Sequence, residues 1–454
     1  MSDLSSDRKK EFCIITAGSV DSGKSTLMSV LVYGDLDDGK GKAREKIAKH
    51  QHEKDTGRTS DISQRVLKIN DKKEVTFVDL CGHEKYLKTT MFGMHGYFPD
   101  YAILVIAANR GILKMTREHL GLLLYMDIPI IITITREDIA PQSEYDRTVK
   151  SIKRILKNFN KKVIFLNGKN KEQKYDLEQE NEKVKEIANE IGINHNITPV
   201  ITISSKTGYY VEPLSKLVSY LNPRKDEWIK DHETGRFTGS VFYIDTTFAV
   251  KGVGLVLSGI LKGDKIKVDD EILIGPHNSE FVKAKVRSIH NNTHEDVKYL
   301  ENTQRGCLAV RIIDKKVEFG RNQIKKGCIV VSSQNQLKNI CFEFSADIQI
   351  LHHSTTISGR FCSVIHCGVI KQSARIILER DQVLKNGDKA SVKFRFLQRP
   401  EFIEVGNQFK FREGNTKGTG IITNILPIKS DTRGPEPIKK RKIYKHKKPK
   451  IIGI

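Results

Sequence analysis

A glycine-rich loop between an apolar run and a helix-like segment limits the possible folds of this 454-residue chain more than any other sequence feature. Residues 12–17 before the loop predict a buried strand, and residues 25–32 after it predict a helix. Glycines let the backbone amides of such a loop curl around phosphate oxygens, while a lysine reaches the β- and γ-phosphates and a serine holds Mg²⁺. The sequence therefore predicts a phosphate-binding loop, formed by Gly18, Ser19, Val20, Asp21, Ser22, Gly23, Lys24, Ser25 and Thr26.

Further apolar runs occupy the first half of the chain, with helix-like stretches such as 116–125 and 145–158 between them. These runs are residues 75–79, 102–108, 130–135, 163–166 and 200–203. Continuous apolar strands separated by helices indicate a doubly wound, mostly parallel sheet that is covered on both faces. We therefore expect an α/β P-loop domain over residues 11–228. The polar stretch between the first helix and the second strand is expected to hold no core element, and residues 169–185 an insertion leading into a helix.

The pattern changes after residue 236 to short strands with glycine-bearing turns about every ten residues, which is typical of small closed barrels. The sequence predicts two all-β barrel domains, at 237–335 and 337–427. The ends of the chain, residues 1–10 and 428–454, lack an apolar period and are predicted to be disordered.

The composition bears on partners and compartment. Lys and Arg number 77 against 55 Asp and Glu, a net charge of +22, which favours a polyanion such as RNA over the alternative of a solvated basic surface. Seven cysteines without a Cys-x-x-Cys pair argue against a disulfide scaffold or a zinc site. Since no run of about 18 apolar residues occurs, we expect no membrane span. The simplest compartment is a reducing cytoplasm, and we expect a monomer.

The C-terminal tail carries a concentrated positive charge. Residues 429–454 hold ten Lys or Arg and two acidic residues, so their net charge is 10 − 2 = +8. Blocks of like charge often bind nucleic acid, although a nuclear-localisation signal or simple solvation are alternatives. The predicted non-specific RNA contacts are Lys439, Lys440, Arg441, Lys442, Lys445, Lys447, Lys448 and Lys450.

Two loops after the first helix have the composition of a nucleotide switch. Asp79 ends a predicted strand and is expected to hold Mg²⁺ through water, and Gly82 to bring an amide to the γ-phosphate. His83 is then expected beside the attacking water as the catalytic residue, the alternative being an exposed loop histidine. Thr59 is a candidate Mg²⁺ ligand in the triphosphate state only, although an exposed loop threonine is its default role.

Residues that follow two later strands predict the choice of base. Asp138 can accept two hydrogen bonds from guanine that adenine cannot supply, and backbone amides near Ser205 and Lys206 can bind the guanine oxygen. Ligands bind at the carboxyl ends of parallel strands, where both segments lie. The predicted base-binding residues are Thr135, Arg136, Asp138, Ser204, Ser205 and Lys206.

With these motifs the chain resembles the translation-factor GTPases related to elongation factor Tu, and most of all the eukaryotic subgroup named for GTP-binding protein one. The supporting runs are residues 83–90, 351–358, 366–368 and 411–414. The resemblance covers roughly residues 11–427 and implies GTP/GDP and Mg²⁺ as ligands and GTP hydrolysis aided by His83. It also implies work on the ribosome with aminoacyl-tRNA or in ribosome rescue. The alternative is a GTP-switched RNA-binding adaptor in mRNA surveillance or turnover.

The chain departs from this family at two places in the site. The usual Asn-Lys-x-Asp motif begins with Thr135, and loss of the Asn is expected to remove hydrogen bonds that tie the motif to the phosphate loop. Arg136 is expected to stack on the base through its planar guanidinium. Arg58 stands before Thr59, where elongation factor Tu has an apolar residue, so Val20 keeps the one apolar wing beside the water site.

Overall fold

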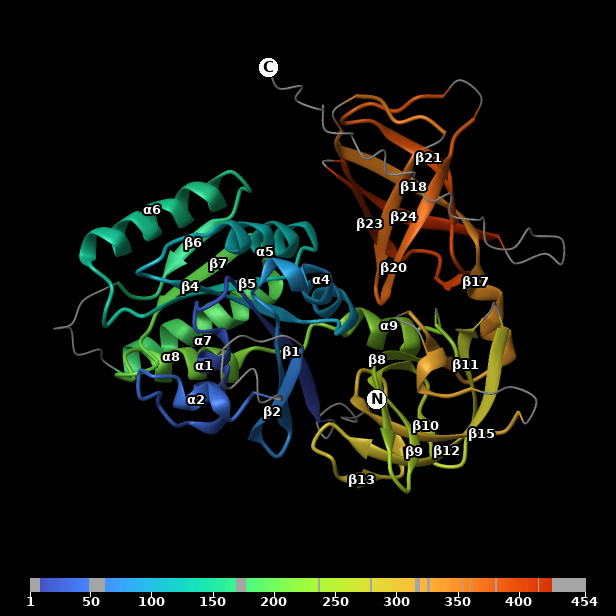
Figure 1. Ribbon diagram of the computed structural model, residues 1–454, viewed down its shortest axis with the longest axis horizontal. Coiled ribbons are helices and arrows are strands. Elements are labelled where there is room, and N and C mark those ends of the chain that lie inside the picture. Colours follow the sequence, from blue (N-terminus) through green and yellow to red (C-terminus); the bar gives the residue numbers. More distant parts are fainter. Residues whose placement is uncertain are drawn as a thin grey trace, which may run out of the picture. The chain divides into compact units, whose positions relative to one another are not determined.

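The computed structural model divides into two compact units (Figure 1). One unit extends to Gln336 and also includes His366–Lys371, and the other comprises Leu337–Ile365 and the residues from Gln372 onward. The structure describes residues 9–48, 62–168, 177–235, 237–277, 280–314, 319–324, 327–353, 355–359, 361–379, 382–414 and 416–426, without the side chains of 88, 92 and 95. Arg58, Thr59 and the basic tail lie outside these ranges.

A seven-stranded sheet forms the centre of the N-terminal α/β domain, in the order β2-β3-β1-β4-β5-β7-β6. All neighbours are parallel except β2 and β3. This confirms the predicted mostly parallel sheet. The strands are β1 (Lys10–Ala17), β2 (Ser63–Asn70), β3 (Lys73–Asp79), β4 (Tyr101–Ala107), β5 (Ile130–Thr135), β6 (Lys162–Phe165) and β7 (Ile197–Thr202).

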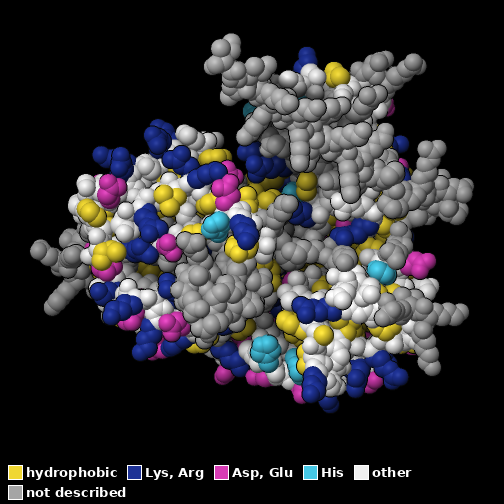
Figure 2. Space-filling model, viewed as in Figure 1, with side chains coloured by type: hydrophobic (Ala, Val, Ile, Leu, Met, Phe, Trp, Pro, Cys, Tyr) yellow, Lys and Arg dark blue, Asp and Glu magenta, His cyan; other side chains and the backbone are white. Residues whose placement is uncertain are grey.

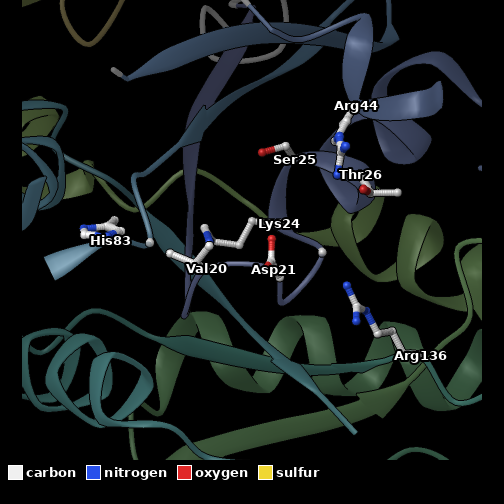
Figure 3. A pocket seen from close by; sticks show the side chains of 10 residues that line it. Val20, Asp21, Lys24, Ser25, Thr26, Arg44, His83 and Arg136 are labelled. Carbon is white, nitrogen blue, oxygen red and sulfur yellow. The ribbon is translucent and has the colours of Figure 1, made fainter. Parts of the chain in front are cut away.

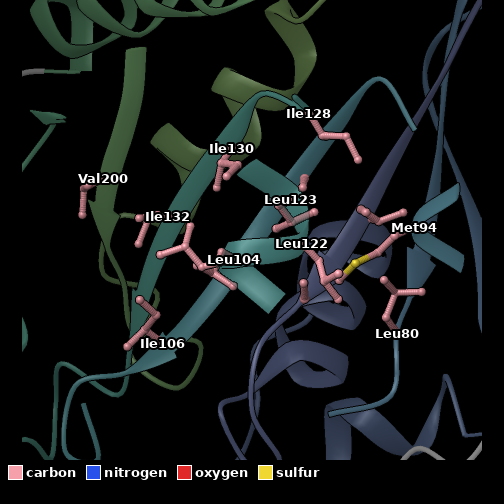
Figure 4. Close-up of a cluster of buried hydrophobic side chains, with 14 of the residues drawn as sticks. Leu80, Met94, Leu104, Ile106, Leu122, Leu123, Ile128, Ile130, Ile132 and Val200 are labelled. Atoms are coloured by element: carbon pink, nitrogen blue, oxygen red, sulfur yellow. The ribbon is translucent and has the colours of Figure 1, made fainter. Parts of the chain in front are cut away.

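Helices cover both faces of this sheet (Figure 1). One face packs against α4, α5 and α6 and holds Leu104 of β4 (Figure 4), while the other packs against α1, α7 and α8 and holds Ile103. Successive strand residues are therefore buried on opposite faces, as a continuous apolar strand requires. The helices are α1 (Lys24–Tyr33), α2 (Lys42–Glu45), α4 (Leu87–Gly96), α5 (Lys114–Tyr125), α6 (Gln142–Lys157), α7 (Leu177–Ile193), α8 (Val211–Tyr220) and α9 (Asp226–Glu233).

The stretch between α1 and β3 contradicts the sequence analysis, which expected no core element there. Ala43 of α2 and the nearby Ile47 are buried, and β2 pairs antiparallel with β3. Leu67 and Ile69 of β2 pack against the α1 side of the sheet. β2 is an edge strand in which polar residues interrupt the apolar ones, as in Leu67, Lys68, Ile69 and Asn70, so it forms no continuous apolar run.

Two closed barrels follow the α/β domain, as predicted. The first has the strand order β11-β16-β8-β9-β15-β12 and closes through pairing of β11 with β12. Its main strands are β8 (Ser240–Val250), β9 (Gly254–Gly263), β11 (Glu271–His277), β12 (Glu280–Asn291), β15 (Arg305–Ile312) and β16 (Ile329–Val331), with the short β10 (Ile266–Lys267), β13 (Asp296–Val297) and β14 (Tyr299–Leu300).

The second barrel has the order β18-β21-β20-β19-β23-β24 and closes through β18 and β24. Its core is a cluster of phenylalanine rings in mutual contact, namely Phe344, Phe394, Phe396, Phe409 and Phe411. The strands are β18 (Glu343–His352), β19 (Cys362–Cys367), β20 (Ile370–Ile377), β21 (Lys389–Phe396), β23 (Gln408–Glu413) and β24 (Thr416–Leu426), with the short β17 (Ile340–Cys341) and β22 (Glu401–Phe402). Among the described residues, no helix is both long enough and apolar enough to cross a bilayer.

A buried arginine joins the α/β domain to the first barrel within the first unit. The Arg305 amide donates a 3.1 Å hydrogen bond to Glu11, its guanidinium donates to the Tyr97 carbonyl at 3.1 Å, and the same guanidinium pairs with Asp245. Burial, reinforced by Glu74, raises the pKa of Glu11 to about 7. The network therefore couples the stability of both domains to the protonation of Glu11.

Replacing Glu11 by Gln should flatten the pH dependence of stability. The pKa of Glu11 is 4.5 in an unperturbed chain and about 7 in the folded protein, so the folded state binds more protons between these values. Stability contributed by the neutral carboxyl is present below pH 4.5 and is lost as the pH rises through 7. Between about pH 5 and about pH 8, the free energy of unfolding of Glu11→Gln should rise by on the order of 2 kcal/mol relative to that of wild type.

Urea unfolding at each pH measures this difference. The single tryptophan, Trp228, packs against Phe98 and Tyr243 close to the junction and supplies a fluorescence signal. Glu186→Gln, on an exposed position of α7, is the control and should keep the wild-type slope. If the free energy of unfolding changed with pH equally in wild type and in Glu11→Gln, the raised pKa of Glu11 would be contradicted.

Candidate nucleotide-binding site

The predicted phosphate loop connects β1 to α1 and is bent by left-handed backbone positions. Gly18 has φ 141°, and a Cβ there would lie 2.3 Å from the Val105 carbonyl oxygen, so a side chain does not fit. Gly23 has φ 90° and directly precedes α1, where left-handed backbone favours glycine. The loop closes on itself because Ser22 donates a 2.9 Å hydrogen bond to the Ser19 carbonyl.

Lys24 lies at the centre of the loop. Its ammonium donates a 2.7 Å hydrogen bond to the Ser19 carbonyl, and the side chain is buried. Burial lowers the pKa of Lys24, while Asp79 opposes that shift. A buried cation that is held by backbone carbonyl oxygen is suited to bind a polyanion that enters the loop.

Asp79, at the end of β3, accepts hydrogen bonds from two hydroxyls. Thr16 donates to one carboxylate oxygen at 2.6 Å, and Ser25 donates to the other at 2.5 Å. The carboxylate and the Ser25 hydroxyl are oxygen ligands of the kind that Mg²⁺ prefers, and they lie side by side. The residues present therefore fit Mg²⁺, and Ser25 and Asp79 stay the expected ligands.

Gly82 packs directly on the phosphate loop. A Cβ at this position would lie 2.6 Å from the Lys24 ammonium and 2.7 Å from the Ser19 carbonyl carbon. The next residue, His83, is exposed, and its Nδ1 accepts a 3.1 Å hydrogen bond from the Lys85 amide at the start of η1 (Glu84–Tyr86). In the structure His83 thus caps a short helix at the edge of the pocket.

The two segments that the sequence analysis expects to bind the base lie next to each other. Ser204 donates a 2.9 Å hydrogen bond to Asp138, and the Ser204 hydroxyl also accepts from the Lys206 amide at 3.3 Å. The Ser205 carbonyl accepts a 2.9 Å hydrogen bond from the Asp37 amide, which ties the segment after α1 to this loop. The Ser204 bond fixes one Asp138 oxygen at the carboxyl edge of the sheet.

Thr135 corrects the expectation that the altered base motif loses its link to the phosphate loop. The Thr135 hydroxyl donates a 2.7 Å hydrogen bond to the Ser22 carbonyl. Thr135 is buried at the end of β5, so a side chain shorter than Asn reaches the loop directly. The backbone of Arg136, the next residue, is left-handed with φ 60°.

A pocket of about 510 Å³, counting space open to solvent, lies over the phosphate loop (Figure 3). The described residues that the sequence predicts for the site but that do not line this pocket are Gly18, Ser19, Ser22, Asp79, Thr135, Asp138, Ser204, Ser205 and Lys206. The lining residues are Val20, Asp21, Gly23, Lys24, Ser25, Thr26, Arg44, Gly82, His83 and Arg136.

The sequence analysis missed three residues of this site. The Gly18 amide donates a 3.0 Å hydrogen bond to Nδ1 of His119, and burial lowers the pKa of His119 to about 3, so the ring is neutral. Thr16 orients Asp79, and Arg44 lines the pocket. Thr16 lies in an apolar strand and His119 in an amphipathic helix. In both, the hydrophobic periodicity of the sequence predicts that the residue is buried but not which hydrogen bonds it forms.

Replacing Thr135 by Val should destabilise the protein by about 1 kcal/mol, because the buried Ser22 carbonyl loses its hydroxyl donor while the side-chain volume is kept. Thr133→Val on the same strand is the matched control, since the buried Thr133 hydroxyl has no hydrogen-bond partner in the structure. Urea unfolding compares the two variants with wild type. Equal stabilities of the Thr135 and Thr133 variants would show that the link is not a stabilising contact.

Comparison with known proteins identifies the family. The family model of the elongation factor Tu GTP binding domain matches residues 9–224. GTP-binding protein 1 of Xenopus laevis is 35% identical over 458 residues, which cover 94% of this chain and 66% of that protein. GTP-binding protein 2 of Mus musculus is 35% identical over 439 residues, which cover 91% of this chain and 69% of that protein. The chain thus spans about two thirds of the length of these relatives.

Solved structures agree on the fold. Translation elongation factor SelB from Methanococcus maripaludis, in complex with the GTP analogue GppNHp, superposes with a TM-score of 0.63. The match covers 93% of this chain and 80% of that chain at 21% identity, and it shows the shared architecture of an α/β domain followed by barrels. The chain therefore belongs to the translation-factor GTPases that share the elongation factor Tu GTP-binding domain, alongside GTP-binding proteins 1 and 2.

Proposed function

We propose that this protein binds GTP and GDP with Mg²⁺ and hydrolyses GTP as a cytoplasmic, monomeric translation factor on the ribosome, acting with aminoacyl-tRNA or in ribosome rescue. One observation carries the proposal: the phosphate loop, Asp79 and the Asp138–Ser204 pair converge at one edge of the sheet. This arrangement combines a polyanion site with a guanine-reading carboxylate. The family relationship supports the same function.

The residues of the phosphate loop would act mainly by position and charge. Lys24 would contact the β- and γ-phosphates, and Ser25 with Asp79 would hold Mg²⁺. When bound, Mg²⁺ neutralises charge on the β- and γ-phosphate oxygens. Gly82 lies against Lys24, so its loop is close enough to respond to the γ-phosphate. Thr59 remains the proposed ligand that distinguishes GTP from GDP.

His83 is the proposed catalytic residue, and its exposed position explains why hydrolysis should need an activator. The ring has to turn toward the phosphates before it can orient water, and in the free protein Nδ1 is hydrogen bonded to the Lys85 amide. An RNA phosphate docked beside His83 would hold the ring inward. Intrinsic turnover is therefore slow in this proposal, and the ribosome accelerates it.

The surface charge supports an RNA partner. Lys and Arg side chains are spread over the visible faces of the α/β domain and the first barrel (Figure 2). The +8 tail would add non-specific phosphate contacts. A distributed basic surface of this kind suits a large RNA better than a small anion.

The outward His83 also favours a second candidate function. If the ring stays at the start of η1, the nucleotide would set the shape of the protein while turnover remains incidental. The protein would then be a GTP-switched RNA-binding adaptor in mRNA surveillance or turnover. Ribosome-stimulated hydrolysis distinguishes the two candidates.

Replacing Asp138 by Asn should weaken the binding of GTP and GDP and favour the binding of xanthine nucleotides, because one of the two acceptor oxygens is replaced by a donor NH₂ group. We expect a loss of guanine affinity on the order of a hundredfold. Calorimetric titration with GDP and xanthosine diphosphate measures the change. Asp146→Asn, at an exposed position of α6, is the control and should bind as wild type. Wild-type protein that bound ATP as tightly as GTP would contradict the base assignment.

Replacing His83 by Ala should leave GTP binding intact and remove most of the ribosome-stimulated rate, on the order of a hundredfold. Single-turnover hydrolysis with and without 80S ribosomes measures the effect. Lys114→Ala breaks the neighbouring exposed Lys114–Glu84 ion pair and is the matched control. If His83→Ala kept the full stimulated rate, the histidine would be structural and the adaptor would become the better candidate.

A further inference from the structure

Arg44 places a cation on the pocket from the segment between α1 and β2. Its side chain points into the pocket beside Thr26, and Arg136 points in from the opposite side (Figure 3). Within the described ranges, the buried Arg44 Nε has no hydrogen-bond partner and the guanidinium forms no ion pair. Since a buried donor without an acceptor is unfavourable, this position indicates a ligand acceptor in the pocket.

The backbone around α2 fixes the start of this segment. Asp37 accepts hydrogen bonds from the amides of Gly41 and Ala43, and Asp38 accepts from the amides of Lys40 and Gly41. These carboxylates satisfy amides that a short helix leaves unpaired. The position of α2 is therefore determined by hydrogen bonds within the segment.

Packing then directs Arg44 toward the pocket. Ala43 and Ile47 on either side of it are buried, and Arg65 donates to the Ile47 carbonyl at 3.0 Å. Gly41 has φ 100°, and a Cβ there would lie 2.8 Å from the Arg44 guanidinium. The guanidinium thus lies over a bare backbone position.

Positive charge gathers at this part of the pocket. Lys24, Arg44 and Arg136 all line it, and Asp21 is the acidic residue among the lining side chains. Asp21 is already paired with Arg110 at 3.3 Å. Like charges held together without enough acids favour an anion between them.

The location of Arg44 indicates which part of a nucleotide it contacts. His83 and Arg44 lie on opposite sides of Lys24 in the pocket (Figure 3). The segment that carries Arg44 is also joined to the base loop through the Asp37–Ser205 hydrogen bond. Arg44 therefore belongs to the end of the pocket nearer the base, away from the γ-phosphate.

We propose that Arg44 is a binding residue for the α-phosphate and ribose of guanine nucleotides, the part that GTP and GDP share. The proposal rests on the proposed nucleotide function of the site. Arg44 then binds both nucleotides alike and does not serve as a γ-phosphate cation. Its contact couples occupancy of the pocket to the segment that leads into β2.

The test compares Arg44→Ala, Arg44→Lys and Lys42→Ala in the full-length chain by calorimetric titration with GTP and with GDP. Arg44→Ala should lower the affinity for both nucleotides by a similar factor of about tenfold or more, as for loss of a charge-assisted hydrogen bond. Arg44→Lys keeps the charge without the planar fork and should lose less. Lys42 is exposed on the same helix and does not line the pocket, so Lys42→Ala should bind both nucleotides as tightly as wild type.

Thermal unfolding without nucleotide checks that Arg44→Ala is folded; if it is not, Arg44→Lys alone decides. Unchanged affinity of Arg44→Lys and Arg44→Ala for both nucleotides would overturn the proposal. A loss confined to GTP would also overturn it, because Arg44 would then act at the γ-phosphate. Wild-type protein that bound neither nucleotide would instead overturn the proposed function itself.

Discussion

The candidate site depends on the parallel register of β1 between β3 and β4. In this register Thr16 lies opposite Asp79, the last residue of β3, and Ala17 lies opposite Leu104 in the middle of β4, so the phosphate loop begins beside the end of β3. A shift of one residue would turn Thr16 to the other face of the sheet. Asp79 would then lose a 2.6 Å hydrogen bond, and the oxygen atoms proposed for Mg²⁺ would separate. The apolar residues that specify the register therefore also position the chemistry.

The α/β domain could be predicted because most of its strands are buried on both faces and therefore form continuous apolar runs. The barrels could be predicted from short strands with regularly spaced turns. The phosphate loop was predictable for a similar reason, since few other structures need that spacing of glycine, lysine and serine. β2 could not be found in this way. Its alternating residues, such as Leu67 and Lys68, belong to an edge strand that gains its burial only by pairing with β3.

The site was predicted less completely than the fold because several of its contacts join distant parts of the chain. Thr135 bonds to Ser22 across 113 residues, and no local pattern indicates that a threonine hydroxyl replaces an amide there. His119 has the spacing of a core helix residue, and only the packed structure shows that it accepts from Gly18. Polar contacts of this kind depend on the exact approach of two backbones, which periodicity does not determine.

The Arg305 network has a consequence for the order of synthesis. Glu11 and Arg305 are separated by 294 residues, so at roughly 5–20 residues per second the ribosome makes the arginine some 15 to 60 seconds after the glutamate. Until then the Glu11 carboxyl and the Tyr97 carbonyl lack the hydrogen bonds that Arg305 donates to them. Synthesis of the first barrel supplies these donors, so the junction forms as a late step that is possible only after both partners have been made.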